Sequence, residues 1–385
     1  MFSSGIKFFN FKKKKYKIPK IKDHLNKLLR DDSSVIKSLS KNYKNSYDLE
    51  IIKKYKKFLN FRIIGMGGSS LGSQAIYDFL KFKIKKNFLF INNLQPKKEV
   101  KKDKNCVNLI ISKSGNTIET IVNSNIFIKK NHKNIFITED KKNYLGLLAK
   151  KLKSEIIHHN NFIGGRYSVL SEVGMLPSEL MGLNSNNFKQ YNNLIKNKKF
   201  INSLINNVSS TLYFINKKKF NSVIINYDES SENLFKWYQQ LIAESLGKKK
   251  KGLLPIVSNM PKDNHSVMQL YLDGFQNNFF TFFYVQESQS ENINDSQILS
   301  SQKFLRGKNL SRIIHAQKIA TEKVFSKKKI PFRSFEIKKR NEKTLGELFC
   351  FFILETILIG KLINVNPFDQ PAVELIKKET KKLLV

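Results

Sequence analysis

The sequence contains few thiols. Only two cysteines, Cys106 and Cys350, occur among the 385 residues. Each lies within an apolar run, and their spacing matches neither a metal-binding nor a redox motif. This excludes a disulfide framework and a thiolate metal site, and we expect both thiols to be buried in a protein of a reducing, cytoplasmic compartment.

The chain also lacks a long uninterrupted hydrophobic run. Its longest apolar stretch, residues 348–365, contains Glu355 and Lys361, so it predicts a core helix rather than a membrane span. The first 22 residues are basic and free of acids, but they are rich in lysine and contain no arginine. We therefore interpret them as part of the mature protein rather than as a targeting peptide.

Acidic residues are scarce. The chain has 31 Asp and Glu against 69 Lys and Arg, which gives a formal net charge of +38. Such a charge is compatible with a nucleic acid, an anionic membrane or an acidic small substrate. The lysines occur in scattered short runs, such as residues 217–219 and 327–329, without a nucleic-acid-binding motif around them. We therefore expect solvated faces, no specific nucleic-acid or membrane partner, and a positive field that attracts an anionic substrate.

The length of 385 residues and a hydrophobic content of 41% are sufficient for two domains. Strand-like and helical patterns alternate in both halves, which predicts an α/β fold with two lobes, each a parallel sheet flanked by helices. The expected parts are a helical N-terminal segment (1–57), a first lobe (58–182), connecting helices (183–218), a second lobe (219–365) and a C-terminal helix (366–385).

Two loops each follow a predicted strand and open a predicted helix. The first reads G-M-G-G-S-S-L-G (residues 65–72), and the second reads S-K-S-G-N-T-I-E-T (residues 112–120). Free backbone amides and hydroxyls at a helix start are suited to a phosphate dianion. Glycines needed only for steric reasons, or a capping box at Thr117, are the alternative explanations.

A third stretch, G-G-R-Y-S, covers residues 164–168. Two glycines allow the backbone to approach a ligand closely, and the guanidinium of Arg166 offers a fixed fork of donors to ligand oxygens. A surface arginine in an ordinary turn is the alternative.

A helical stretch, W-Y-Q-Q-L-I-A-E-S-L-G-K, begins at Trp237. Its apolar residues recur at steps of three and four, and Glu244 lies at the edge of that stripe. Partial desolvation raises the pKa of a carboxylate, which suits a group that takes and returns a proton near neutral pH. A solvated glutamate on a helix flank is the alternative.

Together these stretches resemble the motifs of the bacterial glucose-6-phosphate isomerase (phosphoglucose isomerase) family of the sugar isomerase superfamily. The resemblance extends to D-N-H-S-V-M-Q-L-Y-L-D-G around His265 and to N-P-F-D-Q-P-A-V-E-L-I-K, which ends at Lys377. It covers nearly the whole chain from about residue 61 to residue 377, in family order. The tail departs from the family pattern, because Ala372 and Ile376 stand where glycines are usual.

The resemblance implies two sugar-isomerase-type lobes that interconvert glucose 6-phosphate and fructose 6-phosphate through a cis-enediol(ate). It implies that Glu244 moves the proton between carbons one and two and that Arg166 stabilises the enediolate. His265 and Lys377 match the acid and base that open the sugar ring. Further substrate contacts are implied for Gly68, Ser69, Ser112, Lys113, Ser114, Thr117 and Gln370. No metal or cofactor is implied, and the family's His comes from the neighbouring subunit of a homodimer.

Three alternatives stay open. An isomerase that also accepts mannose 6-phosphate could use the same scaffold, and a nucleic-acid or membrane binder is suggested by charge alone. A non-catalytic sugar-phosphate sensor would keep the serine-rich loop, but it would have no reason to keep Glu244, Arg166, His265 and Lys377 together. All four are present.

Overall fold

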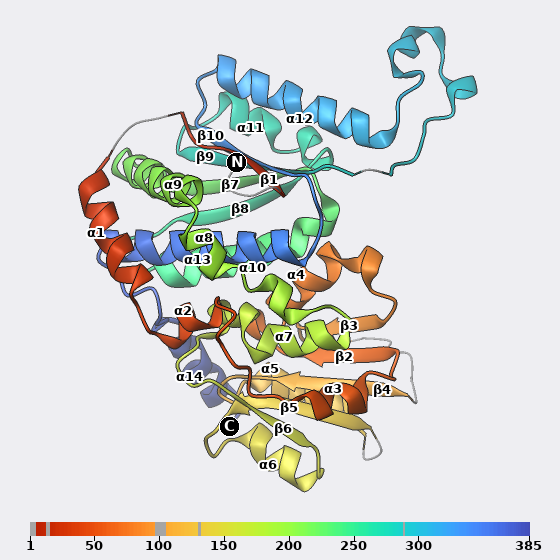
Figure 1. The fold of residues 1–385 in the computed structure, drawn as a ribbon, viewed down its shortest axis with the longest axis vertical. Helices are drawn as coiled ribbons and strands as arrows, with labels where there is room; N and C mark the ends of the chain where they lie inside the picture. The colour runs from red at the N-terminus through yellow and green to blue at the C-terminus, as the bar shows by residue number, and fades with distance from the viewer. Residues whose placement is uncertain (1–4, 13–15, 97–104, 130–131, 288) are drawn as a thin grey trace. The chain divides into compact units, whose positions relative to one another are not determined.

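The computed structural model describes residues 5–12, 16–96, 105–129, 132–287 and 289–385. It contains two five-stranded sheets, each at the centre of a compact unit (Figure 1). The first unit comprises Asp23–Lys196, Asn233–Gly252 and Asn341–Val385, and the second comprises the described residues within Met1–Lys22, Asn197–Glu232 and Leu253–Arg340. No helix among the described residues is long and apolar enough to cross a membrane.

The sheet of the first unit is entirely parallel, with the order β3-β2-β4-β5-β6. Its strands are β2 (Asn60–Ile64), β3 (Asn87–Ile91), β4 (Cys106–Ile111), β5 (Lys133–Glu139) and β6 (Glu155–His159). Because β3 lies on one side of β2 and β4 on the other, the strand order reverses between β2 and β4. Such a reversal is where open α/β sheets bind ligands, at the carboxyl ends of the strands.

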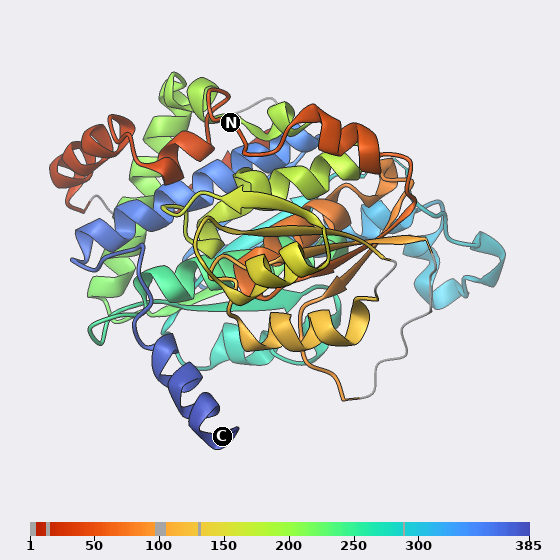
Figure 2. The same cartoon turned by 90° about the horizontal axis from the view of Figure 1, so that it is seen from below.

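Helices cover both faces of this sheet. The helices of the first unit are α1 (Ile18–Leu29, whose first residues belong to the second unit), α2 (Ser34–Ser38), α3 (Leu49–Tyr55), α4 (Leu71–Phe79), α5 (Ile118–Phe127), α6 (Tyr144–Lys151), α7 (Glu172–Leu180), α8 (Tyr191–Ile195), α10 (Glu232–Leu246), α13 (Glu342–Leu362) and α14 (Val373–Leu383). The helices α5 and α6 cover one face, where Ile64, Ile110 and Phe136 form a core with Ile121 and Leu145 (Figure 2).

The second unit has a mixed sheet with the order β1-β10-β9-β7-β8. Its strands are β1 (Ile6–Phe9), β7 (Asn221–Asn226), β8 (Leu254–Asn259), β9 (Asn278–Val285) and β10 (Phe332–Ile337), and its helices are α9 (Lys198–Asn216), α11 (Met268–Asp273) and α12 (Leu310–Lys327). Residues of α11 and α12, including Tyr271 and Phe325, pack on Phe280 and Phe282. On the other face, Phe214 of α9 stacks on Phe279 with ring centroids 5.1 Å apart.

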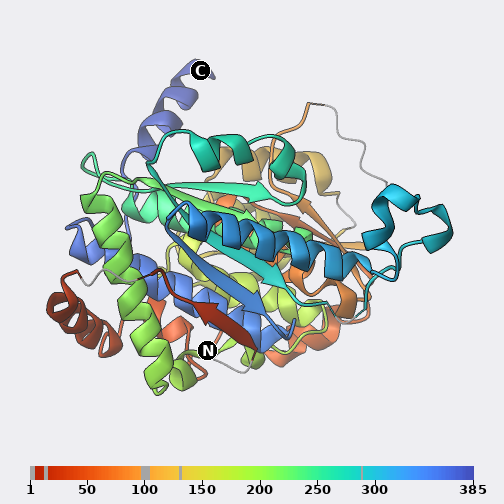
Figure 3. The same cartoon turned by 90° about the horizontal axis from the view of Figure 1, so that it is seen from above.

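Residues 289–309 form an arm that leaves the sheet of the second unit after β9 and returns at α12 (Figure 3). It contains only two short 3-10 helices, Asp295–Gln297 and Ser300–Leu305, neither of which has a buried residue. Leu299 is 75% exposed and Phe304 is 70% exposed. The arm therefore presents apolar side chains that its own unit does not cover.

The α/β fold class predicted from the sequence is confirmed. The N-terminal segment differs from the prediction, because it is not wholly helical: β1 pairs antiparallel with β10, so the second sheet is not purely parallel. β1 is a four-residue edge strand in a lysine-rich region, which is too short for a clear alternating pattern. β3 and β6 were also not predicted. The helices α10 and α13, expected in the second lobe, cluster with the first sheet.

The predicted core helix and buried thiols are observed. All but three residues of α13 are buried, which fits a helix that is apolar on every side. Cys106 and Cys350 are buried free cysteines.

Lys189 is a buried cation of the first unit, only 2% exposed. Its Nζ donates to the carbonyl oxygen of Ser38 at 2.6 Å and to that of Leu170. Burial lowers the pKa of Lys189 from its ordinary 10.5 to about 7. Between these two values the unfolded chain binds more protons than the folded chain, so stability rises with pH in this window.

We predict that Lys189→Met removes this pH dependence. From about pH 7 towards 10.5, the free energy of unfolding of the native protein should rise relative to the variant, by at most about 1.4 kcal/mol per pH unit. Below about pH 7 the difference should be constant, because both states then hold the proton. Urea unfolding of both proteins across this pH range measures the difference in the free energy of unfolding. A difference that stays flat throughout would contradict the prediction.

Candidate active site

Two loops leave the same edge of the first sheet, because β2 and β4 are adjacent parallel strands with Ile64 paired to Ile110. The loops approach each other closely: a Cβ added at Gly65 would lie 2.8 Å from the carbonyl oxygen of Ile111. Glycine is therefore required at residue 65. The loop after β2 continues into the 3-10 helix Gly67–Ser69, which carries the predicted contacts Gly68 and Ser69.

The loop after β4 carries the predicted phosphate contacts. The hydroxyls of Ser112 and Thr117 lie 3.0 Å apart, and Ser114 Oγ accepts from the backbone N–H of Asn116 at 3.3 Å. Thr117 is the N-cap residue of α5, but its side chain makes no capping hydrogen bond. The capping-box alternative is therefore not observed, and the first turn of α5 keeps amides that can donate to an anion.

Neighbouring segments hold this loop in place. Gly115 has a φ of +63°, and a Cβ there would lie 1.9 Å from Asn143 Oδ1. The carbonyl oxygen of Lys113 accepts from Thr138 Oγ1 at 3.2 Å, while Lys113 Nζ lies 3.3 Å from Glu139 Oε1. The backbone at Lys113 is thus fixed, and its charged end points to a carboxylate.

Arg166 lies in the 3-10 helix Gly165–Leu170 and is only 1% exposed. A guanidinium has five N–H donors, and all five are used within the first unit. The acceptors are Ser245 Oγ (2.9 Å), Glu244 Oε2 (3.0 Å), Gln370 Oε1 (2.7 Å), and the carbonyl oxygens of Pro367 (2.7 Å) and Asp369 (3.0 Å). A buried charge is costly unless it is paired and fully hydrogen-bonded, and Arg166 meets both conditions.

The segment that bears Gln370 is attached around this guanidinium by further contacts. Tyr167 Oη donates to the carbonyl oxygen of Pro367 at 2.9 Å and lies 2.8 Å from Ser245 Oγ. Lys248 Nζ donates to the carbonyl oxygen of Asn366 at 2.6 Å. Tyr167, Ser245 and Lys248 were not singled out in the sequence, although all three lie within the motifs quoted above.

Glu244 lies on α10, where its side chain is 29% exposed. Its Oε2 accepts from Arg166 Nη1 at 3.0 Å, and its Oε1 accepts from Gln240 Nε2 at 2.8 Å. The two bonds fix the orientation of a partly accessible carboxylate. Gln240 was missed in the sequence analysis, although its spacing of four residues from Glu244 on one helix is a usable signal.

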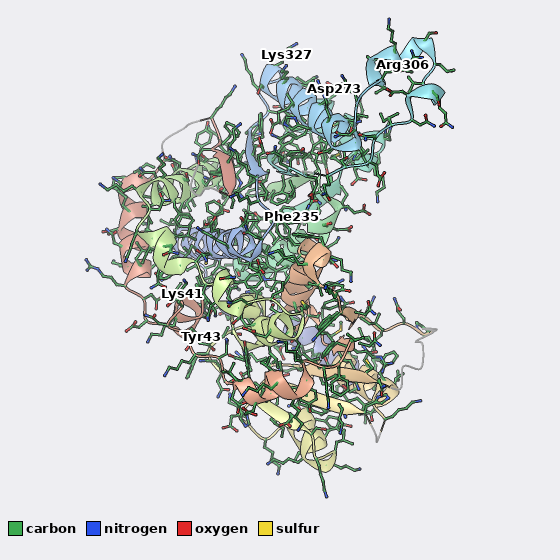
Figure 4. All side chains as sticks on the ribbon, turned by 45° about the vertical axis from the view of Figure 1, so that its right-hand side comes forward. Lys41, Tyr43, Phe235, Asp273, Arg306 and Lys327 are labelled. Carbon is green, nitrogen blue, oxygen red and sulfur yellow. The ribbon has the colours of Figure 1, made fainter. Side chains whose placement is uncertain are left out.

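A buried pair lies behind the segment that carries Arg166. His159 Nδ1 lies 2.5 Å from Glu172 Oε1, and His159 Nε2 lies 3.0 Å from the carbonyl oxygen of Ile163. Tyr43, labelled in Figure 4, donates to Glu172 Oε2 at 2.9 Å. Burial raises the pKa of Glu172, but the hydrogen bond and charge of His159 outweigh it, so the pKa lies below its ordinary value. These contacts support residues 159–172, and the sequence did not reveal them.

The glycines of G-G-R-Y-S were expected to allow a close backbone contact, but the glycine that this contact needs is Gly68. A Cβ on Gly165 would have 3.8 Å to its nearest neighbour, so an alanine has room there. A Cβ on Gly68, in contrast, would lie 2.2 Å from the carbonyl of Gly165 and 2.6 Å from the backbone nitrogen of Arg166. The absence of a side chain at Gly68 therefore allows the loop after β2 to contact the segment of Arg166.

Two of the predicted catalytic residues are not among those that the first unit gathers around Arg166. His265 belongs to the second unit and is an exposed residue at the end of the 3-10 helix Lys262–His265. Lys377 lies on α14, where its side chain is 53% exposed and its Nζ donates to Glu374 Oε1 at 2.6 Å. No residue of α14 is buried. The first unit thus brings together Arg166, Glu244 and Gln370, but not Lys377.

We predict that Gly68→Ala displaces the segment of Arg166. Overpacking of this kind typically costs about 1–3 kcal/mol. The only tryptophan of the chain, Trp237, donates from Nε1 to the carbonyl oxygen of Arg166 at 3.2 Å, so its fluorescence reports on the same segment. We expect a lower urea midpoint and a shifted emission maximum.

Gly146→Ala is the matched control. A Cβ there would lie 3.4 Å from its nearest neighbour, within α6. Alanine is favoured over glycine inside a helix by about 1 kcal/mol, so this variant should be at least as stable as the native protein, with unchanged emission. Gly68→Ala with native emission and stability would show that the close approach is not needed.

Comparisons with known proteins agree with the motifs. The sequence profile of the phosphoglucose isomerase family matches residues 33–384. The chain is 34% identical over 359 residues to the glucose-6-phosphate isomerase of Methanocaldococcus jannaschii, covering 86% of each chain. It is 30% identical over 354 residues to that of Mycoplasmopsis pulmonis, covering 84% of this chain and 82% of the relative.

Solved structures show the same fold. A hypothetical protein from Thermus thermophilus superposes with a TM-score of 0.83 at 22% identity, covering 96% of this chain and 95% of that one. A glucose-6-phosphate isomerase from Chlamydia trachomatis gives a TM-score of 0.71 at 19% identity, covering 87% of this chain and 71% of that one. The resemblance stated from the motifs is thereby confirmed, and the chain belongs to the phosphoglucose isomerase family.

Proposed function

We propose that the protein interconverts glucose 6-phosphate and fructose 6-phosphate by proton transfer at Glu244. The observation that supports this most directly is the contact of 3.0 Å between a permanently charged guanidinium, Arg166, and an oriented, partly accessible carboxylate, Glu244. Both lie in the unit whose sheet carries the serine-rich loop at its switch point. The family membership and the curated relatives, which are named as isomerases, favour this over a sensor.

The substrate phosphate is expected at the start of α5. Ser112 Oγ lies 3.0 Å from the hydroxyl of Thr117, the N-cap residue of α5, and Lys113 and Ser114 belong to the same loop. The positive end of the helix dipole favours a dianion there. Gly68 and Ser69, on the neighbouring loop, are expected to contact the sugar. Fixing the phosphate sets the distance from carbons one and two to Glu244, which lowers the entropic part of the barrier.

The proton transfer uses both members of the pair. Glu244 takes the proton from carbon two of the open-chain aldose, and the electrons of that C–H bond form the enediolate. The negative charge that develops on oxygen is stabilised by Arg166, whose charge does not depend on pH. Glu244 then returns the proton to carbon one, while the hydroxyl proton on the oxygen of carbon two passes to the oxygen of carbon one, which leaves the carbonyl at carbon two. Because the two hydrogens of Arg166 Nη1 are bonded to Glu244 and Gln370, a substrate oxygen reaches this group by replacing one of them.

Ring opening is expected to use His265 and Lys377 and to need a second copy of the chain. Both residues lie on exposed elements of the single chain. Two surfaces support a homodimer as the working form. The arm exposes Leu299 and Phe304, and α14 exposes Leu375 and Ile376 at 64% and 70%. Contiguous exposed apolar side chains commonly mark interaction sites. The two free, buried thiols suit activity in the cytoplasm.

We predict that Glu244→Gln loses turnover by roughly 10²–10⁴-fold, while saturable binding of fructose 6-phosphate is largely kept. Proton NMR in deuterated water should show glucose 6-phosphate with deuterium at carbon two for the native protein and no conversion for the variant. Glu232→Gln, at the start of the same helix, is the control and should turn over like the native protein. Near-native turnover by Glu244→Gln would refute the assigned base.

We predict that mixing two inactive variants restores activity if His265 acts on the neighbouring subunit's substrate. In a heterodimer of Glu244→Gln with His265→Ala, one of the two sites combines an intact Glu244 with an intact His265 from the other chain. Differently tagged chains purified as heterodimers should therefore reach about half of the native turnover. Each variant alone is the control. No recovery in verified heterodimers would place His265 in the site of its own chain, whereas full activity of His265→Ala alone would place it outside the reaction.

A further inference from the structure

The second unit contains a concavity of about 1290 Å³. Residues from the starts of β9 and β10, from the end of β1 and from the C-terminal parts of α9 and α12 line it. It therefore lies at the edge where the parallel strands begin. Ligands of open α/β sheets bind at the opposite, carboxyl edge, so this concavity is not the second unit's equivalent of the proposed active site.

The lining is strongly basic, with seven lysines and two acids. Both acids already have a lysine partner: Asp273 Oδ1 lies 3.7 Å from Lys328 Nζ, and Glu322 Oε1 lies 3.0 Å from Lys318 Nζ. Figure 4 labels Asp273 and Lys327, both of which line the concavity. Six lining lysines have no carboxylate within ion-pair distance among the described residues: Lys12, Lys217, Lys219, Lys323, Lys327 and Lys329.

The positive lining does not follow from the net charge of the chain alone. A smaller concavity of about 550 Å³ in the first unit is lined by Arg30, Lys37 and Lys44 together with Asp31 and Asp32. Its charges nearly cancel, whereas those of the larger concavity do not. Lysines gathered from three segments at one concave surface create a focused positive potential, which concentrates anions.

Two further features indicate the chemistry of the ligand. Ser334 lines the concavity and is 1% exposed, yet its Oγ has no hydrogen-bond partner within the described part of the chain. A buried hydroxyl without a partner is costly, so a polar ligand atom there would be favourable. In addition, Phe275 is 54% exposed and Phe9 is 47% exposed, both on the lining. Exposed rings beside lysines are the combination on which nucleobases stack.

We propose that this concavity binds a nucleoside polyphosphate, with the lysines around the phosphates and an aromatic ring against the base. Lysine is a point-charge phosphate ligand, and its flexible side chain adapts to several phosphates in a row. The volume exceeds the 300–1,000 Å³ of typical small-ligand sites, so a nucleotide fits within it.

The test is titration calorimetry with ATP, tripolyphosphate and a single-stranded RNA dodecamer as separate probes, on the full-length protein. We expect one ATP to bind per chain, with no competition from fructose 6-phosphate. The triple variant Lys323→Glu, Lys327→Glu, Lys329→Glu should weaken ATP binding by more than about tenfold, because it places negative charges opposite the phosphates.

Matched variants separate local from general effects. Lys142→Glu, Lys150→Glu, Lys151→Glu makes the same change in net charge on exposed residues of the first unit and should leave ATP affinity within about twofold, because none of these lysines lines the concavity. Phe275→Ala should weaken ATP severalfold but leave tripolyphosphate unchanged, because only ATP has a base to stack. Circular dichroism verifies the fold of each variant.

The other outcomes overturn the proposal. ATP that fails to bind, or that fructose 6-phosphate displaces, excludes a separate nucleotide site. Equal losses of ATP affinity in both triple variants would mean that the net charge of the chain, rather than this concavity, determines binding. If tripolyphosphate bound as tightly as ATP, the base would contribute nothing to affinity, and the site would not be one for a nucleotide. RNA that binds much more tightly than ATP, with the same dependence on Lys323, Lys327 and Lys329, would make this surface a nucleic-acid site instead.

Discussion

The proposed active site depends on one buried cation. Arg166 is nearly inaccessible to water, and a lone charge in that position would be strongly destabilising. Its cost is offset because five acceptors, including one carboxylate, surround it at hydrogen-bonding distances. Removing the guanidinium would leave several buried acceptors without donors, which is usually more costly than the net value of the bonds themselves. The same atoms thus hold the segment at residues 366–370 and orient Glu244, so stability and chemistry depend on one group.

Close backbone contacts make this arrangement possible. The loop after β2 meets the segment of Arg166 only because Gly68 has no side chain, and it meets the loop after β4 only because Gly65 has none. These contacts join parts of the chain that are about fifty to a hundred residues apart in sequence, as in any site assembled by non-local packing. The strand reversal between β2 and β4 supplies the location, since both loops leave the sheet at adjacent strand ends.

Local patterns in the sequence were sufficient for the central strands and for the chemistry of the motifs. The apolar stripe of α10 is buried as expected, because apolar residues at helical spacing face the core. β1 was missed because a four-residue edge strand has little periodicity and is determined by its partner. Gln240 and the pair of His159 with Glu172 were missed because their roles arise from neighbours that only the fold brings together. Family resemblance, rather than pattern, singled out Lys377.

His265, Lys377 and the arm share one property, which is exposure in the single chain. His265 is exposed on a 3-10 helix, Lys377 is exposed on a helix without a buried residue, and the arm exposes Leu299 and Phe304. The single chain buries Arg166, but it leaves these elements uncovered. Apolar side chains exposed on two separate elements are instead expected where a second copy covers them. The proton-transfer pair is therefore complete within one unit, whereas the proposed ring-opening residues lie on elements that the single chain leaves exposed. This separation is why the heterodimer experiment tests from which chain His265 acts.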